Sequence, residues 1–88
     1  MYIKKVIMAI KFDSGFEIIR FSDVRYEEIT IEIQFNDEAI LQINRDYGVG
    51  NLEVELLFDF VQNDLCPKFR LDDFMIVINE AKKILTQS

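Results

Sequence analysis

Carboxylates are the side chains of this sequence best suited to chemistry or to binding a charge. Asp and Glu number 16 against 10 Lys and Arg, histidine and tryptophan are absent, and there is one cysteine, Cys66. Without histidine, the chain lacks the side chain that most often transfers protons near neutral pH, and it cannot form a Cys/His zinc site. A single cysteine also excludes a disulfide framework. The side chains that remain available for chemistry are mainly carboxylates, hydroxyls and lysines.

Three pairs of carboxylates are close in the sequence: Glu27–Glu28, Glu53–Glu55 and Asp72–Asp73. Members of the first pair point to opposite faces if they lie in a strand, whereas the second pair shares a face but has no evident proton partner. The third pair is explained by the start of a helix. We predict no catalytic residue, because acid–base catalysis needs a perturbed pair in a cleft and 88 residues leave little room for one.

Oxygen ligands for a hard cation are also present, in a set of four: Asp37, Glu38, Asp46 and Asn51. Their spacing does not match that of a calcium-binding loop, in which ligands alternate around a glycine. We therefore predict no metal site and no cofactor.

The charge is distributed unevenly along the chain. Residues 13–66 carry thirteen acidic side chains against three arginines, whereas the net charge of the whole chain is −6. An acidic surface repels phosphate backbones and attracts cations, so direct nucleic-acid binding is disfavoured and docking to a basic protein is favoured. The simpler interpretation, which stays open, is that the excess of acid keeps a small apolar domain in solution.

The elements that must position these charges are mostly strands. Five segments show the two-residue alternation of strands: Ile3–Phe12, Phe16–Phe21, Ile29–Phe35, Ala39–Arg45 and Leu52–Phe60. We expect reversals at Gly15 and at Asn36–Asp37, and a bulge or an end of pairing near Ile18 and Ile19. A helix over Leu52–Gln62 is the alternative for the last segment, since its leucines also have helical spacing.

Residues near the C-terminus have the period of a helix. Its apolar stripe is formed by Phe74, Met75, Ile78, Ala81, Ile84 and Leu85. Asp72 is placed to cap the N-terminus of this helix. Residues 1–88 thus read as a single α+β domain, an antiparallel β-meander of about five strands with a C-terminal helix packed on one face. The phenylalanines, Phe69 and Phe74 among them, are expected to fill the core between sheet and helix.

The candidate binding surface follows from the alternation. If Ile31 and Ile33 point inward, Glu32 points outward, and the acids of the last strand segment face outward in the same way. Tyr47 lies in a glycine-containing loop, where an aromatic ring can serve as an anchor for a partner. The predicted partner-binding residues are Glu32, Asp46, Tyr47, Glu53, Glu55 and Asp59.

No stretch reaches the roughly 18 uncharged apolar residues that a membrane-spanning helix needs. Lys4, Lys5 and Lys11 interrupt the apolar N-terminal stretch, which also lacks the pattern of a secretory signal. With one thiol and no export signal, we expect a cytoplasmic location and no membrane contact.

Three stretches carry a resemblance to a known group of proteins: Tyr47-Gly-Val-Gly-Asn-Leu-Glu-Val-Glu-Leu, Phe69-Arg-Leu-Asp-Asp-Phe and Ala81-Lys-Lys-Ile-Leu. They resemble the small cytoplasmic immunity proteins encoded beside bacterial toxins, including those of contact-dependent growth inhibition. The resemblance implies a non-enzymatic inhibitor that binds a toxin domain, often a basic nuclease. It carries over no toxin-binding residue.

Two further functions are compatible with the residues. A phage or plasmid protein that mimics nucleic-acid charge would space its acids like phosphates along an elongated surface. A homo-oligomeric structural module would instead pair the edges of its isoleucine-rich strands.

Overall fold

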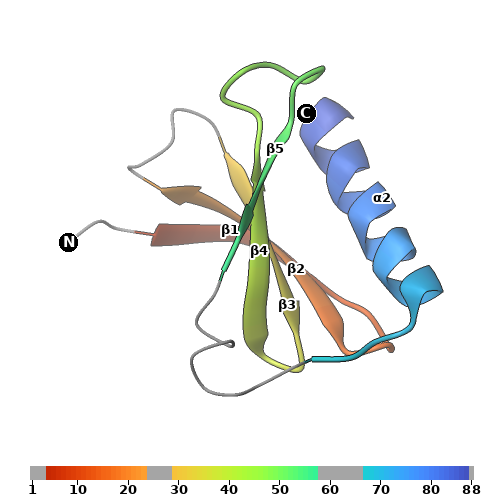
Figure 1. The fold of residues 1–88 in the computed structure, drawn as a ribbon. Helices are drawn as coiled ribbons and strands as arrows, with labels where there is room; N and C mark the ends of the chain where they lie inside the picture. Colours follow the sequence, from red (N-terminus) through yellow and green to blue (C-terminus); the bar gives the residue numbers. More distant parts are fainter. Residues whose placement is uncertain (1–3, 24–28, 58–66, 88) are drawn as a thin grey trace.

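A computed structural model describes residues 4–23, 29–57 and 67–87 of the chain. In sequence order, its strands are β1 (Lys4–Lys11), β2 (Phe16–Asp23), β3 (Thr30–Phe35), β4 (Glu38–Asn44) and β5 (Glu53–Leu56). Each pairs antiparallel with the next to form one five-stranded sheet, and the helix α2 (Leu71–Gln87) packs on one of its faces (Figure 1). The predicted α+β meander with a C-terminal helix is confirmed.

The sheet is twisted, so that β1 runs across the direction of β4 (Figure 1). The predicted interruption at Ile18 and Ile19 is wrong, because β2 pairs continuously with β3 over this stretch. Register shifts lie instead in β1, where Ile7 is inserted between Val6 and Met8, and in β4, where Ile40 is inserted between Ala39 and Leu41.

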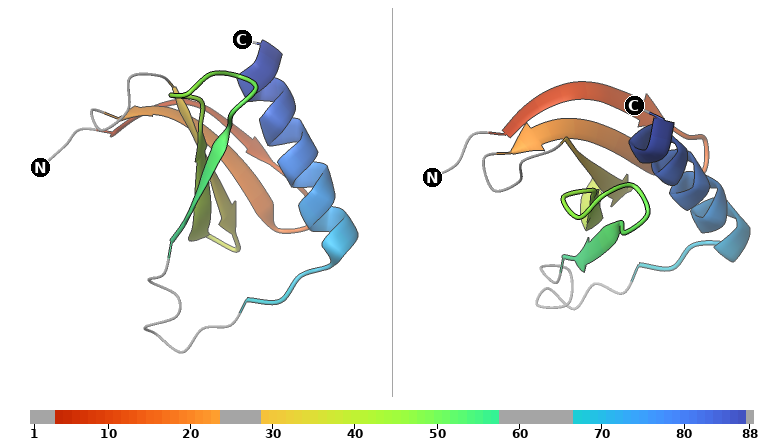
Figure 2. Two further views of the ribbon diagram at one scale, coloured as in Figure 1. Left: turned by 45° about the horizontal axis from the view of Figure 1, so that its top comes forward. Right: turned by 90° about the horizontal axis from the view of Figure 1, so that it is seen from above.

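The core fills the space between α2 and the sheet. Its buried apolar side chains come from four elements: Phe16 and Ile18 of β2, Ile31 and Ile33 of β3, Leu41 and Ile43 of β4, and Val77, Ala81 and Leu85 of α2. Figure 2 shows α2 lying along one side of the curved sheet, where it contacts β2 and β3. Burial of these side chains is the main force that holds the helix on the sheet.

Aromatic rings close the core at the N-terminal end of α2. The ring of Phe16 lies 4.9 Å from that of Phe69 and 4.8 Å from that of Phe35, and Phe74 stacks on Phe69 at 5.2 Å. The expectation that Phe69 and Phe74 fill the core is confirmed. The helix itself begins at Leu71, so Asp72 lies within its first turn and not at the predicted capping position.

The segment that begins at Leu52, for which the sequence allows a strand or a helix, is a strand where the structure describes it. Residues Glu53–Leu56 form β5, which pairs with β4, so the alternative of a helix from Leu52 is wrong for these residues. The remainder of the predicted strand, including Asp59, lies outside the described residues, as does Cys66. Within the described ranges, no helix has both the length and the apolar character that crossing a membrane requires.

Candidate functional site

The face of the sheet opposite α2 carries polar side chains in rows that cross the strands. Glu32 of β3 lies opposite Gln42 of β4, which lies opposite Glu55 of β5. In the next row, Asn44 of β4 lies opposite Glu53 of β5. Residues directly opposite each other share a face, so three of the predicted binding acids lie on this one.

Glu32 is nevertheless buried. Only 5% of its surface is exposed, and Gln34 Nε2 donates a hydrogen bond of 2.7 Å to its Oε2. The expectation that it points into solvent is wrong, because β3 is the central strand and Glu32 is flanked by Ile19 of β2 and Gln42 of β4. Its carboxylate is part of the sheet's polar interior and is not available to a large partner.

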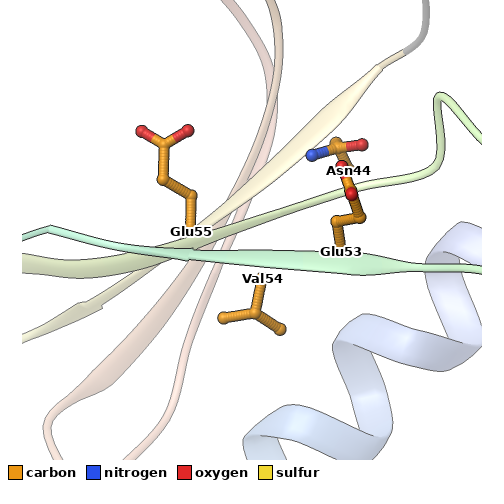
Figure 3. Close-up of a pocket in the computed structure, with 4 residues that line it drawn as sticks. All are labelled: Asn44, Glu53, Val54 and Glu55. Atoms are coloured by element: carbon orange, nitrogen blue, oxygen red, sulfur yellow. The ribbon is translucent and has the colours of Figure 1, made fainter.

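Glu53 and Glu55 are exposed, and they line an open depression of about 390 Å³ together with Asn44 and Val54. Figure 3 shows the two carboxylates and the Asn44 amide on one side of β5, with Val54 on the other side, towards α2. Side chains two apart on a strand are roughly 7 Å from each other, so both carboxylates can act on one cationic group. This pair is the centre of the candidate site.

Strands β3 to β5 contain acidic side chains and no basic ones: Glu32, Glu38, Glu53 and Glu55. Arg45 directly follows β4, but its Nη1 donates a hydrogen bond of 2.9 Å to the carbonyl of Leu85 at the end of α2. Arg45, the arginine nearest to the depression in sequence, therefore ties the end of β4 to the C-terminal part of α2.

Asp46 and Tyr47 lie in the loop that joins β4 to β5. The backbone N–H of Asp46 donates to Asn44 Oδ1 at 3.2 Å, which ties the loop to a residue of the depression. The carbonyl of Tyr47 accepts a hydrogen bond of 3.2 Å from Asn51 Nδ2. Tyr47 as a whole is 70% exposed. Asp46 is half-buried, so Tyr47 is the accessible member of the two.

Sequence reasoning missed Asn44 and Val54 as residues of the site. The alternation along β4 places Asn44 on the face of Gln42, but only the register with β5 brings it opposite Glu53. That register depends on where the β4–β5 loop ends, which no pattern in the sequence determines. Val54 lies on the side of β5 towards α2 (Figure 3), yet it is 57% exposed, and the main contacts of α2 are with β2 and β3.

The two exposed carboxylates are suited to holding a cationic side chain by charge-assisted hydrogen bonds, whereas Asn44 is 5% exposed and supports the loop through Asp46. Among the described residues, no three His, Cys, Asp or Glu side chains are grouped so that they could hold a metal ion. The comparisons add no further constraint, since no protein-family model, curated protein or solved structure matches the chain.

Proposed function

We propose that this chain is a non-enzymatic immunity protein, which binds a basic bacterial toxin domain in the cytoplasm and blocks it. The toxin domain is a nuclease, whose basic cleft for nucleic acid is the surface that an acidic inhibitor covers. Glu53 and Glu55 make the central contact, and Tyr47 supplies an aromatic anchor beside them.

One observation carries the proposal. Glu53 and Glu55 are both exposed on the same face of an edge strand, and the sequences of strands β3 to β5 contain four glutamates and no lysine or arginine. Two carboxylates roughly 7 Å apart on one strand face repel each other, most strongly at low salt. A basic partner removes this repulsion when it binds, and its association is accelerated by electrostatic steering.

The shape of the molecule favours a protein partner over mimicry of nucleic acid. The Cα atoms span 32 × 31 × 22 Å, so two of the three dimensions are nearly equal. A charge mimic of a duplex needs an elongated surface along which acids follow the spacing of phosphates. The exposed acids of the candidate site are instead gathered at one edge of the sheet.

The test is to measure by stopped flow the rate at which the chain associates with a cognate toxin nuclease domain. We expect the double variant Glu53→Lys/Glu55→Lys to lower the rate constant about tenfold or more at low salt, and much less at high salt.

The matched control is Asp13→Lys/Glu38→Lys. It changes the net charge equally, but both residues are exposed in or next to turns, and Glu38 lies at the opposite end of β4 from Asn44. If the control slows association as much as the Glu53/Glu55 variant, the slower association is caused by the change in net charge and not by the position of the two glutamates. An association rate that neither variant changes at low salt contradicts the proposal.

A further inference from the structure

Among the described residues, the outer edge of β5 presents backbone groups that no strand pairs. The N–H of Leu57 donates to the carbonyl of Ile40 in β4 at 2.9 Å. Residues of an antiparallel strand alternate in direction, so Glu55 also turns its N–H and C=O groups towards β4, whereas Val54 and Leu56 turn theirs away. In the part of the chain that the structure describes, no strand lies beyond β5. Val54 and Leu56 therefore offer hydrogen-bonding groups to an incoming strand.

The side chains of β5 are exposed along its whole length. Val54 and Leu56 are 57% and 53% exposed. Val54 lies on the side of α2, whereas Glu53 and Glu55 lie on the opposite side (Figure 3), and Leu56 shares the face of Val54 because it is two residues further along the strand. An added strand would meet an apolar surface on one side and two carboxylates on the other. Its own residues would have to alternate between apolar and cationic types to match.

The other edge of the sheet differs. Strand β1 has an extra residue at Ile7, and Lys5 and Lys11 are exposed on it. Bulges and lysines are devices that prevent a sheet edge from pairing with another chain. Strand β5 pairs with β4 in continuous register and carries neither a lysine nor a proline. Of the two edges formed by described strands, that of β5 therefore lacks these devices.

A second copy of this chain is a poor occupant for that edge. Antiparallel pairing of β5 with β5 of another copy brings the glutamates of both strands onto the same face, where like charges repel. Pairing of β5 with β1 joins unlike surfaces, does not close, and would propagate into an open polymer. The charge on β5 instead suits a foreign strand with basic side chains.

We propose that β5 is the docking edge for an extended segment of the basic partner, which adds antiparallel to the sheet as a further strand. Its apolar residues lie opposite Val54 and Leu56, and its basic residues lie on the face of Glu53 and Glu55. The inference rests on the proposed function for the identity of the partner, and it adds the mode of recognition, in which backbone pairing and charge act together.

The probe is a short end-blocked peptide of alternating Lys and Val, added to the isotopically labelled protein. We expect amide exchange at Val54 and Leu56 to slow about tenfold or more on binding. Because directly opposed residues share a face, the valine amides of the peptide are the ones that face β5. N-methylation of valine amides should weaken binding about tenfold or more, whereas N-methylation of lysine amides should change it less than about twofold.

Each alternative result has a distinct meaning. If both N-methylated peptides bind equally weakly or equally well, strand addition is overturned. If the variant Glu53→Lys/Glu55→Lys nevertheless weakens peptide binding about tenfold, binding of the peptide by the two glutamates is retained as an explanation. If that variant binds the peptide as the wild type does, the acidic docking on which the proposed function depends fails as well. Slow exchange of the Val54 and Leu56 amides in the free protein would show that this edge is already paired, and would also overturn the inference.

Discussion

Single residues determine where the sheet reverses. Gly15 has a φ of +100° in the β1–β2 turn, and Asn36 and Asp37 have φ values of 48° and 70° in the β3–β4 turn. Positive φ at both central residues is what a two-residue type I′ hairpin requires. The backbone N–H of Asn36 also donates to the carbonyl of Gly15 at 2.9 Å, so the two turns support each other.

Replacement of Gly15 by alanine should destabilise the fold by about 1–3 kcal/mol. A Cβ atom at this position would lie 2.6 Å from Asn36 Oδ1 and 3.3 Å from the Phe35 ring, on a backbone with a φ that favours glycine. Urea denaturation followed by circular dichroism measures the loss. Gly50→Ala is the control, since nothing lies within 4 Å of its Cβ. We expect Gly50→Ala to be neutral or to stabilise by up to about 1 kcal/mol, and equal losses in both variants would contradict the steric explanation.

At the scale of elements, alternation in the sequence correctly predicted the five strands and the face to which Glu32, Glu53 and Glu55 belong. It did not predict burial, because Glu32 is covered by neighbours that the register of three strands brings together. The same limit applies to the bulge at Ile7, which depends on pairing with β2. The start of α2 was misplaced by a residue or two, since the end of a helix depends on its docking as well as on capping preference.

The docking of α2 depends on its buried stripe, and Leu85 tests this. It is 1% exposed, and we expect Leu85→Ala to lower the free energy of unfolding by about 2–5 kcal/mol. Leu71→Ala removes the same atoms from a residue of the same helix that is 70% exposed, and should cost less than about 1 kcal/mol. Guanidinium denaturation of both variants gives the comparison. Similar losses would show that helix propensity, and not packing on the sheet, holds α2 in place.

At the scale of the whole molecule, the uneven distribution of charge along the sequence predicts an acidic surface, but it does not predict which of the acidic side chains are exposed. The acidic middle of the chain gives exposed carboxylates at Glu53 and Glu55, as the spacing predicts. The same acidic stretch contains Glu32, which is buried, and Asp46, which is half-buried. No pattern in the sequence distinguishes these two residues from Glu53 and Glu55. Strands β3 to β5 are close in sequence and adjacent in the sheet, so local charge becomes a feature of one side of the molecule.

Under the proposed function, that side of the molecule binds a partner without pairing with itself, and the glutamates of β5 would serve both purposes. We expect the chain to be monomeric at neutral pH and the variant Glu53→Gln/Glu55→Gln to self-associate, because neutral side chains no longer oppose pairing between exposed β5 edges. Sedimentation velocity over a range of protein concentrations measures this. Asp13→Asn/Glu38→Gln removes the same charge from residues outside β5 and should remain monomeric. Self-association of this control would assign the effect to net charge, and a wild-type dimer would show that Glu53 and Glu55 do not protect the edge.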